Sequence, residues 1–176
     1  MKHTSIEIKA ICDDPFRIID WLEKNQARYI GEDIQTDTYF LVKQGRLKHR
    51  EGQIENNLIY YERNDKAGPK KSKINIYPCT REGNLIQILI QALGMKVQVK
   101  KIRRIYIIET IKIHLDIVEG LGSFVEIEVF VSGEAQEESR GRTQCKLLMD
   151  KWGIKEGDLI GASYSDLMIA KNNRIL

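Results

Sequence analysis

The chain of 176 residues is 42% hydrophobic and 30% charged, which is typical of one soluble globular domain, and its net charge of +3 is too small to indicate a nucleic-acid-binding protein by itself. No run approaches the roughly 20 apolar residues of a membrane span, and the first residues do not form the hydrophobic region of a signal peptide. Three widely separated cysteines suggest neither a disulfide framework nor a zinc knuckle. We therefore expect a cytoplasmic protein with a single domain over residues 1–176.

The first half of the chain is predicted to form short strands around one helix. Ser5–Lys9 alternates polar and apolar residues, which is typical of a strand with one polar face. Asp14 before Pro15 is typical of a helix start, and apolar residues follow at helical spacing to about Gln26. Alternation on both sides of a turn at Gln44-Gly45 predicts a hairpin over residues 36–51. Further β-rich stretches after this hairpin predict strands over residues 58–63 and 71–77.

The second half begins with a predicted helix over residues 81–93, where apolar residues follow one helix face and Gly94 is placed to end it. Three β-rich segments with short connections come next and predict an antiparallel meander. A charge-rich amphipathic helix is expected from Glu134 to Trp152, and Ser163 or Ser165 could cap a short last helix. Many short antiparallel strands with few helices predict an α+β fold whose sheet curls into a barrel. The three β-rich segments cover residues 96–108, 110–118 and 123–131.

Charged residues recur on one side of several predicted strands. Residues two apart in a strand share a face, so Arg46, Lys48 and Arg50 project together. Such a stripe can be a solvated sheet face, because like charges repel unless water or a counter-charge compensates them. The alternate positions are apolar, however, which indicates that the other side packs under helices and that the charges converge inside the barrel. The other stripes are Lys101 with Arg103, Glu126 with Glu128, and Glu7 with Lys9.

A barrel interior lined with arginine, lysine and carboxylates is costly to desolvate, so it indicates a binding site and not a structural core. Basic side chains suit phosphate oxygens, and arginine can hold two of them at once. Carboxylates suit a hard cation such as Mg²⁺, which bridges the same phosphates. The pattern therefore predicts a site for a polyanion with a divalent metal ion.

Several of these segments resemble, in order, the sequence blocks of the CYTH family, which includes class IV adenylate cyclases and triphosphatases. Ser5–Lys9 is similar to the Glu-x-Glu-x-Lys signature of that family, and residues 37–40 with residues 45–50 resemble its basic second hairpin. The set spans most of the chain, and its order makes the resemblance specific. Similar blocks also cover residues 58–63, 68–72, 100–104, 114–128 and 163–167.

The resemblance implies an antiparallel eight-stranded β-barrel with flanking helices, whose tunnel binds a triphosphate with Mg²⁺ or Mn²⁺. It also implies a small-molecule substrate such as ATP, thiamine triphosphate or tripolyphosphate, bound by a monomer or homodimer without a nucleic-acid or membrane partner. Carried over by position, the phosphate-binding residues are Lys9, Arg46, Lys48, Arg50, Arg63, Lys101 and Arg103, of which Lys9, Arg50 and Lys101 are the catalytic candidates. The implied metal ligands are Glu7, Asp116, Glu126 and Glu128.

One position departs from the family signature, because Ser5 stands where the first acidic residue is expected. A hydroxyl is a poor replacement for a carboxylate as a direct ligand of Mg²⁺, although the remaining carboxylates suffice for at least one ion. His114 shares strand parity with Asp116 and could face the tunnel, but an isolated histidine is more often structural. Lys71 and Lys73 follow a glycine-proline loop and are interpreted as solvated lysines in preference to residues at the tunnel mouth.

The same site fits two reactions. Hydrolysis would release phosphate from a terminal phosphorus, whereas cyclisation of ATP would form cyclic AMP and release pyrophosphate. No residue is identified that would recognise adenine, which favours a triphosphatase over a cyclase. A third interpretation is a non-catalytic triphosphate or polyphosphate sensor, because the first acid is replaced. A nucleic-acid-binding module would account for the locally basic segments but not for the carboxylates, which repel phosphates.

Overall fold

Within residues 1–173, which the computed structural model describes, the chain forms eight strands and four α-helices. The predicted domain of residues 1–176 extends past this range, since residues 174–176 lie outside the described residues. The strands are β1 (Lys2–Ile11), β2 (Arg28–Phe40), β3 (Arg46–Glu51), β4 (Asn57–Arg63), β5 (Lys70–Pro78), β6 (Met95–Ile108), β7 (Ile111–Val118) and β8 (Gly122–Val131). The helices are α1 (Pro15–Lys24), α2 (Leu85–Leu93), α3 (Ala135–Trp152) and α4 (Tyr164–Asn172), with a 3-10 turn, η1, at Glu156–Asp158.

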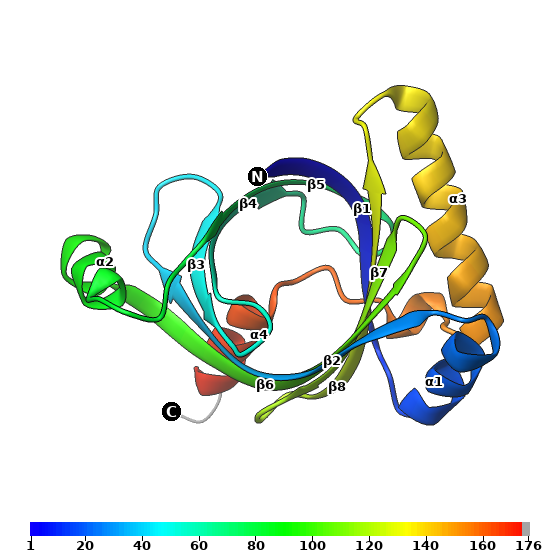
Figure 1. Ribbon diagram of the computed structural model, residues 1–176, viewed down its shortest axis with the longest axis horizontal. Coiled ribbons are helices and arrows are strands. Elements are labelled where there is room, and N and C mark those ends of the chain that lie inside the picture. Colours follow the sequence, from blue (N-terminus) through cyan, green and yellow to red (C-terminus); the bar gives the residue numbers. More distant parts are fainter. Residues whose placement is uncertain (174–176) are drawn as a thin grey trace.

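The strands close into a barrel in the order β1-β5-β4-β3-β2-β6-β7-β8 (Figure 1). Every pair of neighbours is antiparallel, and β6, β7 and β8 follow one another as the predicted meander. The predicted hairpin consists of β2 and β3, joined by a turn in which Gly45 has a φ of 63°. The antiparallel eight-stranded barrel with flanking helices is therefore confirmed.

Strand β2 begins at Arg28, well before the predicted start at Thr36. Its pairing with β6 continues past a register shift between Tyr29 and Gly31, where the strand bulges. Residues 31–37 pair with β6 without a shift, but their inward side chains, Asp33, Gln35 and Asp37, are polar and Ile34 is exposed, so the first half of this long strand lacks the apolar alternation that would have predicted it. That half turns several polar side chains into the barrel.

The start of α2 also differs from the prediction, since the helix begins at Leu85 and not at Arg81. Gly83 has a φ of 103°, which lies outside the helical region, so the segment before Leu85 cannot continue the helix. Ser163 caps α4, as one of the two predicted alternatives, because its hydroxyl accepts the Asp166 N–H at 3.2 Å. Among residues 1–173, no helix is both long enough and apolar enough to cross a membrane.

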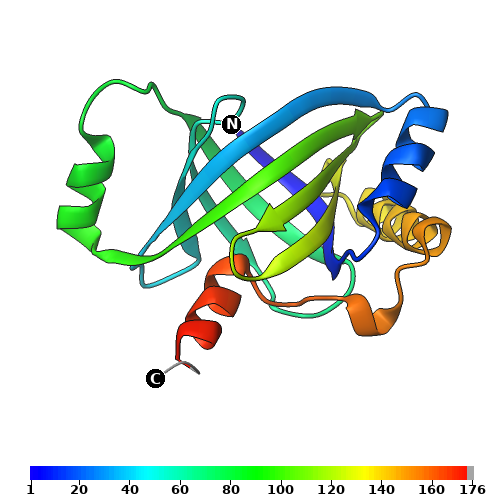
Figure 2. The ribbon, with the colours of Figure 1, turned by 90° about the horizontal axis from the view of Figure 1, so that it is seen from below.

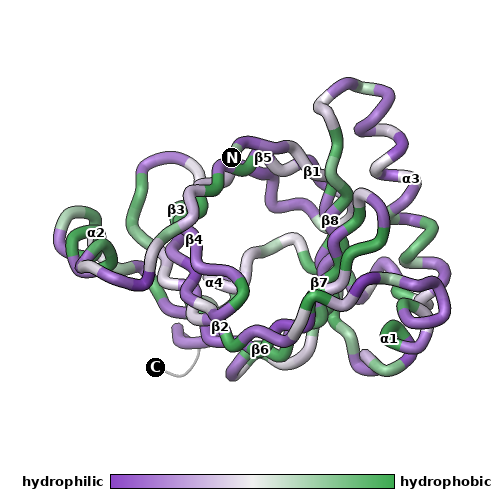
Figure 3. The backbone as a smooth tube through the Cα atoms, viewed as in Figure 1, coloured by the Kyte–Doolittle hydropathy of each residue, from purple (hydrophilic) through white to green (hydrophobic). Residues whose placement is uncertain are grey.

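The larger part of the core lies between one wall of the barrel and helices α1 and α3. Strands β1 and β8 turn alternate apolar residues outward, among them the buried Ile8 and Ile127. Leu22 of α1 and Trp152 of α3 belong to the same buried cluster. Figure 3 shows apolar stretches on the side of the barrel that carries these two helices. Since successive side chains of a strand point to opposite faces, the polar residues of this wall face the barrel interior.

The two ends of the barrel differ. Helix α4 lies at one end, and its first residue, Tyr164, is buried in a cluster that includes Tyr61 and Phe124. The N-terminus of the chain lies at the opposite end (Figure 2). The loop between β3 and β4, residues 52–56, is at that opposite end too, because β3 runs away from α4. The interior is thus bounded by the start of α4 at one end and by the β3–β4 loop at the other.

Candidate active site

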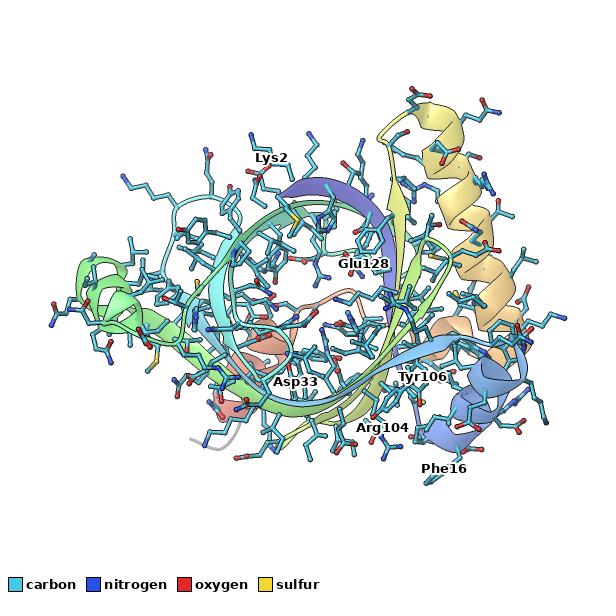
Figure 4. The ribbon with its side chains drawn as sticks, in the orientation of Figure 1. Lys2, Phe16, Asp33, Arg104, Tyr106 and Glu128 are labelled. Carbon is cyan, nitrogen blue, oxygen red and sulfur yellow. The ribbon has the colours of Figure 1, made fainter. Side chains whose placement is uncertain are left out.

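A cavity of about 140 Å³ occupies the interior of the barrel. Figure 4 shows Glu128 on the inner side of the barrel wall, whereas Phe16 and Arg104 lie outside it. Cationic side chains outnumber carboxylates in the lining, which makes the cavity attractive to an anion. The charged lining consists of Lys9, Lys48, Arg50, Arg63, Arg103 and Lys112 with Glu7, Glu55, Glu126 and Glu128.

The cationic side of the cavity is organised around Asp37 of β2, whose side chain is fully buried. Lys48 Nζ donates to this carboxylate at 2.8 Å, Arg50 Nε at 2.8 Å and Lys101 Nζ at 2.7 Å. Burial disfavours the charged amines, and the nearby Arg50 adds repulsion, so the pKa of Lys48 falls to about 8 and the pKa of Lys101 to about 7. Arg50 also pairs with Glu55, so two carboxylates face the three basic side chains of this cluster and compensate them only in part.

A second buried cluster joins β6, β7 and α4 through Arg103. Its guanidinium donates to both oxygens of Asp116, at 2.6 and 2.5 Å, and to Glu126 at 2.7 Å. The hydroxyl of Tyr164 donates to Asp116 at 2.8 Å. Burial opposes ionisation of Asp116, but the Arg103 guanidinium outweighs it and lowers the pKa of that carboxyl. The start of α4 is thus tied directly to the charged interior.

Two further carboxylates, Glu7 and Glu128, lie with Glu126 on the paired strands β1 and β8. In the register of these strands Glu7 is opposite Glu128, and Lys9 is opposite Glu126. Arg63 of β4 donates to Glu7, and Lys9 Nζ lies 3.2 Å from Glu126. Burial works against ionisation of Glu126, yet Lys9 keeps the pKa of this carboxyl well below its ordinary value. Each carboxylate already has a cationic or histidine partner.

Most of the predicted site residues meet in this one cavity, but three lie outside its lining. Arg46 is at the α4 end, where it donates to Asp65 at 2.5 Å and to Asp166 at 2.9 Å. Lys101 and Asp116 are buried behind the lining in the two clusters described above. The predicted residues that line the cavity are Glu7, Lys9, Lys48, Arg50, Arg63, Arg103, Glu126 and Glu128.

Strand parity separates Lys71 and Lys73 from the cavity. Both lie within β5, not in a loop, and Lys71 donates to Glu138 of α3 on the outside of the barrel while Lys73 is exposed. Lys70 has the opposite parity and is buried, with its Nζ 3.4 Å from the Ile160 carbonyl. The inward lysine of this segment is therefore one that the sequence interpretation did not name.

The β3–β4 loop contributes a carboxylate that the sequence prediction missed. Glu55 accepts from Arg50 at 2.8 Å and from Lys112 of β7, so it spans the cavity. Asp33 of β2 fixes the loop by accepting the backbone N–H groups of residues 53, 54 and 55 at 2.6, 3.1 and 3.0 Å. A loop residue follows no strand or helix period, so the alternation that marked the strand residues gave no signal for Glu55.

Several buried polar atoms facing the interior have no hydrogen-bond partner among residues 1–173. They include the hydroxyl oxygens of Ser5 and Ser72, which are opposite each other on β1 and β5, and Nε2 of His114. His114 lines the cavity, as its parity suggested, and its Nδ1 lies 3.4 Å from Glu126. Buried polar groups are usually paired, so these atoms fit an interior that receives a polar ligand.

The carboxylates of the interior have the chemistry of a site for a hard divalent cation, because Mg²⁺ and Mn²⁺ prefer oxygen ligands. Glu7, Glu126 and Glu128 share one cavity with the cationic side chains that suit phosphate. In the part of the chain that the structure describes, no three His, Cys, Asp or Glu side chains are gathered closely enough to hold an ion as they stand. The three carboxylates supply oxygen donors of the kind such an ion prefers, and each is paired with a cationic or histidine side chain in this structure.

The sequence matches the CYTH domain family over residues 3–164. The Methanocaldococcus jannaschii protein MJ0240, whose name describes a proposed adenylate cyclase, is 28% identical over 181 residues, which cover 92% of this chain and 97% of that protein. The match extends over nearly the whole chain in both comparisons.

Solved structures share the barrel. The PH1012 protein from Pyrococcus horikoshii has a TM-score of 0.80 at 24% identity, with 93% of this chain and 98% of that chain covered. HpAC1 from Hippeastrum, described as a proposed adenylyl cyclase with a dominant triphosphatase activity, has a TM-score of 0.60 at 12% identity, with 97% and 96% covered. With its family match and its closed antiparallel barrel, this chain belongs to the CYTH family, whose members are adenylate cyclases or triphosphatases that generally depend on divalent metal ions.

Proposed function

We propose that this chain is a metal-dependent triphosphatase that binds its substrate inside the barrel. The observation that supports this proposal most is the group of three buried basic side chains, Lys48, Arg50 and Lys101, that converge on the carboxylate of Asp37, with Glu55 as a second partner of Arg50. Incompletely compensated buried charge is costly, and an apolar core would be more stable. A triphosphate supplies the missing negative charge, so the arrangement is favourable when the ligand is bound.

The cations that line the cavity would hold the phosphate oxygens. Arg50, Arg63 and Arg103 project from β3, β4 and β6, so their guanidinium groups approach the interior from different sides. Each can donate to two oxygens, whereas Lys9 acts as a compact charge near the α4 end. Lys101 lies behind this lining and would add positive charge to the site without touching the ligand. Arg46 would instead keep α4 in place through Asp166.

Glu7, Glu126 and Glu128 would hold Mg²⁺ or Mn²⁺, with Asp116 placed behind them by Arg103. These carboxylates are now paired with Arg63, Lys9 and other cationic groups. A triphosphate would take over those cations, and the released carboxylates would take the metal ion, so the number of paired charges in the interior is kept. When bound, the ion would neutralise negative charge on the phosphates and polarise a phosphoryl oxygen.

In hydrolysis the barrel residues would act mainly by position and charge. Phosphoryl transfer needs its attacking and leaving oxygens in line and its equatorial oxygens neutralised. Arg50, Arg63 and Arg103 project into the interior and are themselves oriented by carboxylates, so they are already arranged for developing negative charge. Lys9 lies 3.5 Å above the ring of Tyr164, which places its ammonium group near the start of α4.

A class IV adenylate cyclase is the second candidate, and its support is the similarity to MJ0240 over 92% of this chain. The same cations and carboxylates would then hold ATP while its 3′-hydroxyl attacks the α-phosphorus, which forms cyclic AMP and releases pyrophosphate. Nucleic-acid binding is less well supported, because Lys48, Arg50 and Arg103 from the basic segments lie in the interior and not on an open surface.

The test is to incubate the purified protein with ATP, thiamine triphosphate and tripolyphosphate, each with Mg²⁺, with Mn²⁺ and with a chelator, and to separate the products by ion-exchange chromatography. We expect phosphate release that stops in the chelator. Cyclic AMP with an equal amount of pyrophosphate would establish the cyclase instead. Binding of a triphosphate without any product over a long incubation would indicate a sensor, and neither binding nor product would contradict both enzymatic candidates.

A further inference from the structure

Helix α2 stands apart from the rest of the chain. It projects from the side of the barrel opposite α1 and α3 (Figure 1 and Figure 2). Within residues 1–173 it is the one α-helix without a buried side chain, although every residue in it except Gln87 and Gln91 is apolar. A helix that is apolar nearly all round is normally buried, so α2 carries more apolar surface than the barrel covers.

The helix has little local support of its own. It has nine residues, and isolated helices shorter than roughly 12–15 residues are marginal in water. Asn84 makes no side-chain hydrogen bond as the N-cap, and neither the first nor the last turn carries a charge that favours the helix dipole. Packing must therefore stabilise α2, and the barrel contacts only one of its faces. That face consists of the half-buried Ile86, Leu89, Ile90 and Leu93.

The outward face of α2 is an exposed apolar stripe. Leu85 is 37% exposed and Ile88 is 50% exposed, and Ala92 lies one turn further along the same face. We call these three residues the α2 stripe. Leu41, which is 55% exposed, adds apolar surface at the end of the helix, where its N–H donates to the Gly94 carbonyl at 3.1 Å.

The sequence of α2 is suited to pairing with itself. Read backwards, LIQILIQAL is the same except that Ile86 and Ala92 change places. A twofold interface brings the same surface of two copies together, so each side chain has to fit a symmetry-related one. In an antiparallel pair of α2 stripes the two Ile88 side chains meet near the axis. Leu85 of each copy then lies beside the small Ala92 of the other, which lets the two helices approach closely.

The charges around α2 favour the same arrangement. Residues 83–95 contain no charged side chain, while Glu82 precedes the helix and Lys96 follows it. An antiparallel pair places Glu82 of one copy near Lys96 of the other and brings opposite ends of the helix dipoles together. A helix that lies on a membrane surface carries lysine and arginine on its polar face, whereas the polar residues of α2 are Gln87 and Gln91. A second copy of the chain therefore suits this surface better than a lipid surface does.

We propose that α2 forms the interface of a homodimer, in which two copies pair their α2 stripes antiparallel across a twofold axis. The inference does not depend on what the barrel binds. A helix of nine residues is about 14 Å long, so the interface is at the small end of specific protein interfaces. We therefore expect a dimer with a dissociation constant in the micromolar range.

Sedimentation velocity of the full chain, from nanomolar to several hundred micromolar concentration, measures the mass of the species in solution. Ile88→Glu places a carboxylate at the proposed axis, on a half-exposed site where the barrel should keep its fold, which far-UV circular dichroism checks. Ile34→Glu is the matched control, since Ile34 is a 74% exposed isoleucine on the outside of β2. Glu82→Lys tests the antiparallel arrangement, because it would place like charges near Lys96.

The wild type and Ile34→Glu should approach twice the 20.4 kDa mass of one chain as the concentration rises. Ile88→Glu should weaken the dimer about 10- to 100-fold, because two carboxylates would meet in an apolar contact. Glu82→Lys should weaken it about 2- to 10-fold at low salt and less at high salt.

A wild type that stays monomeric at every concentration would overturn the inference. Dissociation of the dimer by Ile34→Glu and not by Ile88→Glu would also overturn it, because the interface would then lie on the outer face of the barrel. A Glu82→Lys variant that forms dimers as readily as the wild type at low salt would contradict the antiparallel arrangement.

Discussion

Lys101 donates to Asp37 at 2.7 Å, and neither side chain has any exposure to solvent. Lys48 and Arg50 donate to the same carboxylate, so its removal would leave three buried cations without their shared counter-charge. Breaking a buried ionic cluster in this way typically costs about 3–5 kcal/mol.

Asp37→Asn should therefore lower the free energy of unfolding strongly, and tripolyphosphate should restore more stability to this variant than it adds to the wild type. Urea unfolding with and without tripolyphosphate measures both quantities. Glu32→Gln, which removes a carboxylate from the exposed ion pair with Arg104, is the control and should change little. A stable Asp37→Asn variant would show that the cluster does not carry surplus positive charge.

The lowered pKa of Lys101, about 7 in the folded chain, predicts a pH dependence of stability. Burial is the first cause and the neighbouring Arg50, Arg103 and Lys48 add to it, while Asp37 opposes them. Between pH 7 and the ordinary lysine pKa of about 10.5, the unfolded chain binds more protons than the folded chain at this residue. The contribution of Lys101 to the free energy of unfolding therefore rises with pH in this window.

Urea unfolding of the wild type and of Lys101→Met across that pH range tests the assignment. Methionine keeps most of the side-chain volume but cannot titrate, so the rise of stability with pH should be smaller in the variant. Parallel pH profiles for the two proteins would mean that Lys101 keeps its proton throughout, and that Asp37 compensates it more fully than we infer.

The β3–β4 loop gives a prediction about how the cavity is bounded. A Cβ atom at Gly52 would overlap the carboxylate of Asp33, which holds the loop through three backbone N–H groups. Gly52→Ala should therefore displace the loop, destabilise the fold by about 1–3 kcal/mol and speed amide exchange at residues 53–55. Gly157→Ala is the control, because a Cβ there meets no atom within 4 Å. Unchanged exchange at residues 53–55 would mean that Asp33 does not fix the loop.

Ser5 gives a prediction about the metal ion. Its side chain is fully buried on the strand face that carries Glu7, and its hydroxyl has no hydrogen-bond partner among the described residues. Ser5→Glu would add a carboxylate on this face, so activity should reach half its maximum at a lower Mg²⁺ concentration. Ser5→Gln, which has a similar size and no charge, should not show this change. If the two variants depend on Mg²⁺ as the wild type does, position 5 does not face the ion.

The inward residues of regular strands could be predicted from the sequence, because alternation is a local property of the chain. Arg50, Arg103 and Glu126 were found in this way, and all three line the cavity. Asp37 has the same inward parity on β2, and its buried position could have been inferred from alternation alone. It was passed over because it stands alone and not in a stripe of like charge.

Other parts of the site could not be predicted, because tertiary contacts place them. Glu55 belongs to a loop that Asp33 anchors across the barrel, and Tyr164 reaches Asp116 from a helix distant in the sequence. Neither contact is marked by a repeating pattern in the sequence. Arg46 was predicted to line the cavity because it shares parity with Lys48. It lies at the end of its strand, however, where it pairs with Asp65 and Asp166 outside the cavity.

The proposed function requires that the cations of the interior bind a triphosphate. Lys48→Met removes one charge from the lining while Arg50 and Lys101 still pair with Asp37, and Lys146→Met removes an exposed charge from α3 as the matched control. We would measure the apparent affinity of these variants and the wild type for tripolyphosphate in Mg²⁺ by thermal-shift titration. Binding by the wild type and the control, with affinity about 10- to 100-fold lower in Lys48→Met, is the predicted result. Equal affinity in all three proteins, or no binding by the wild type, would contradict the claim.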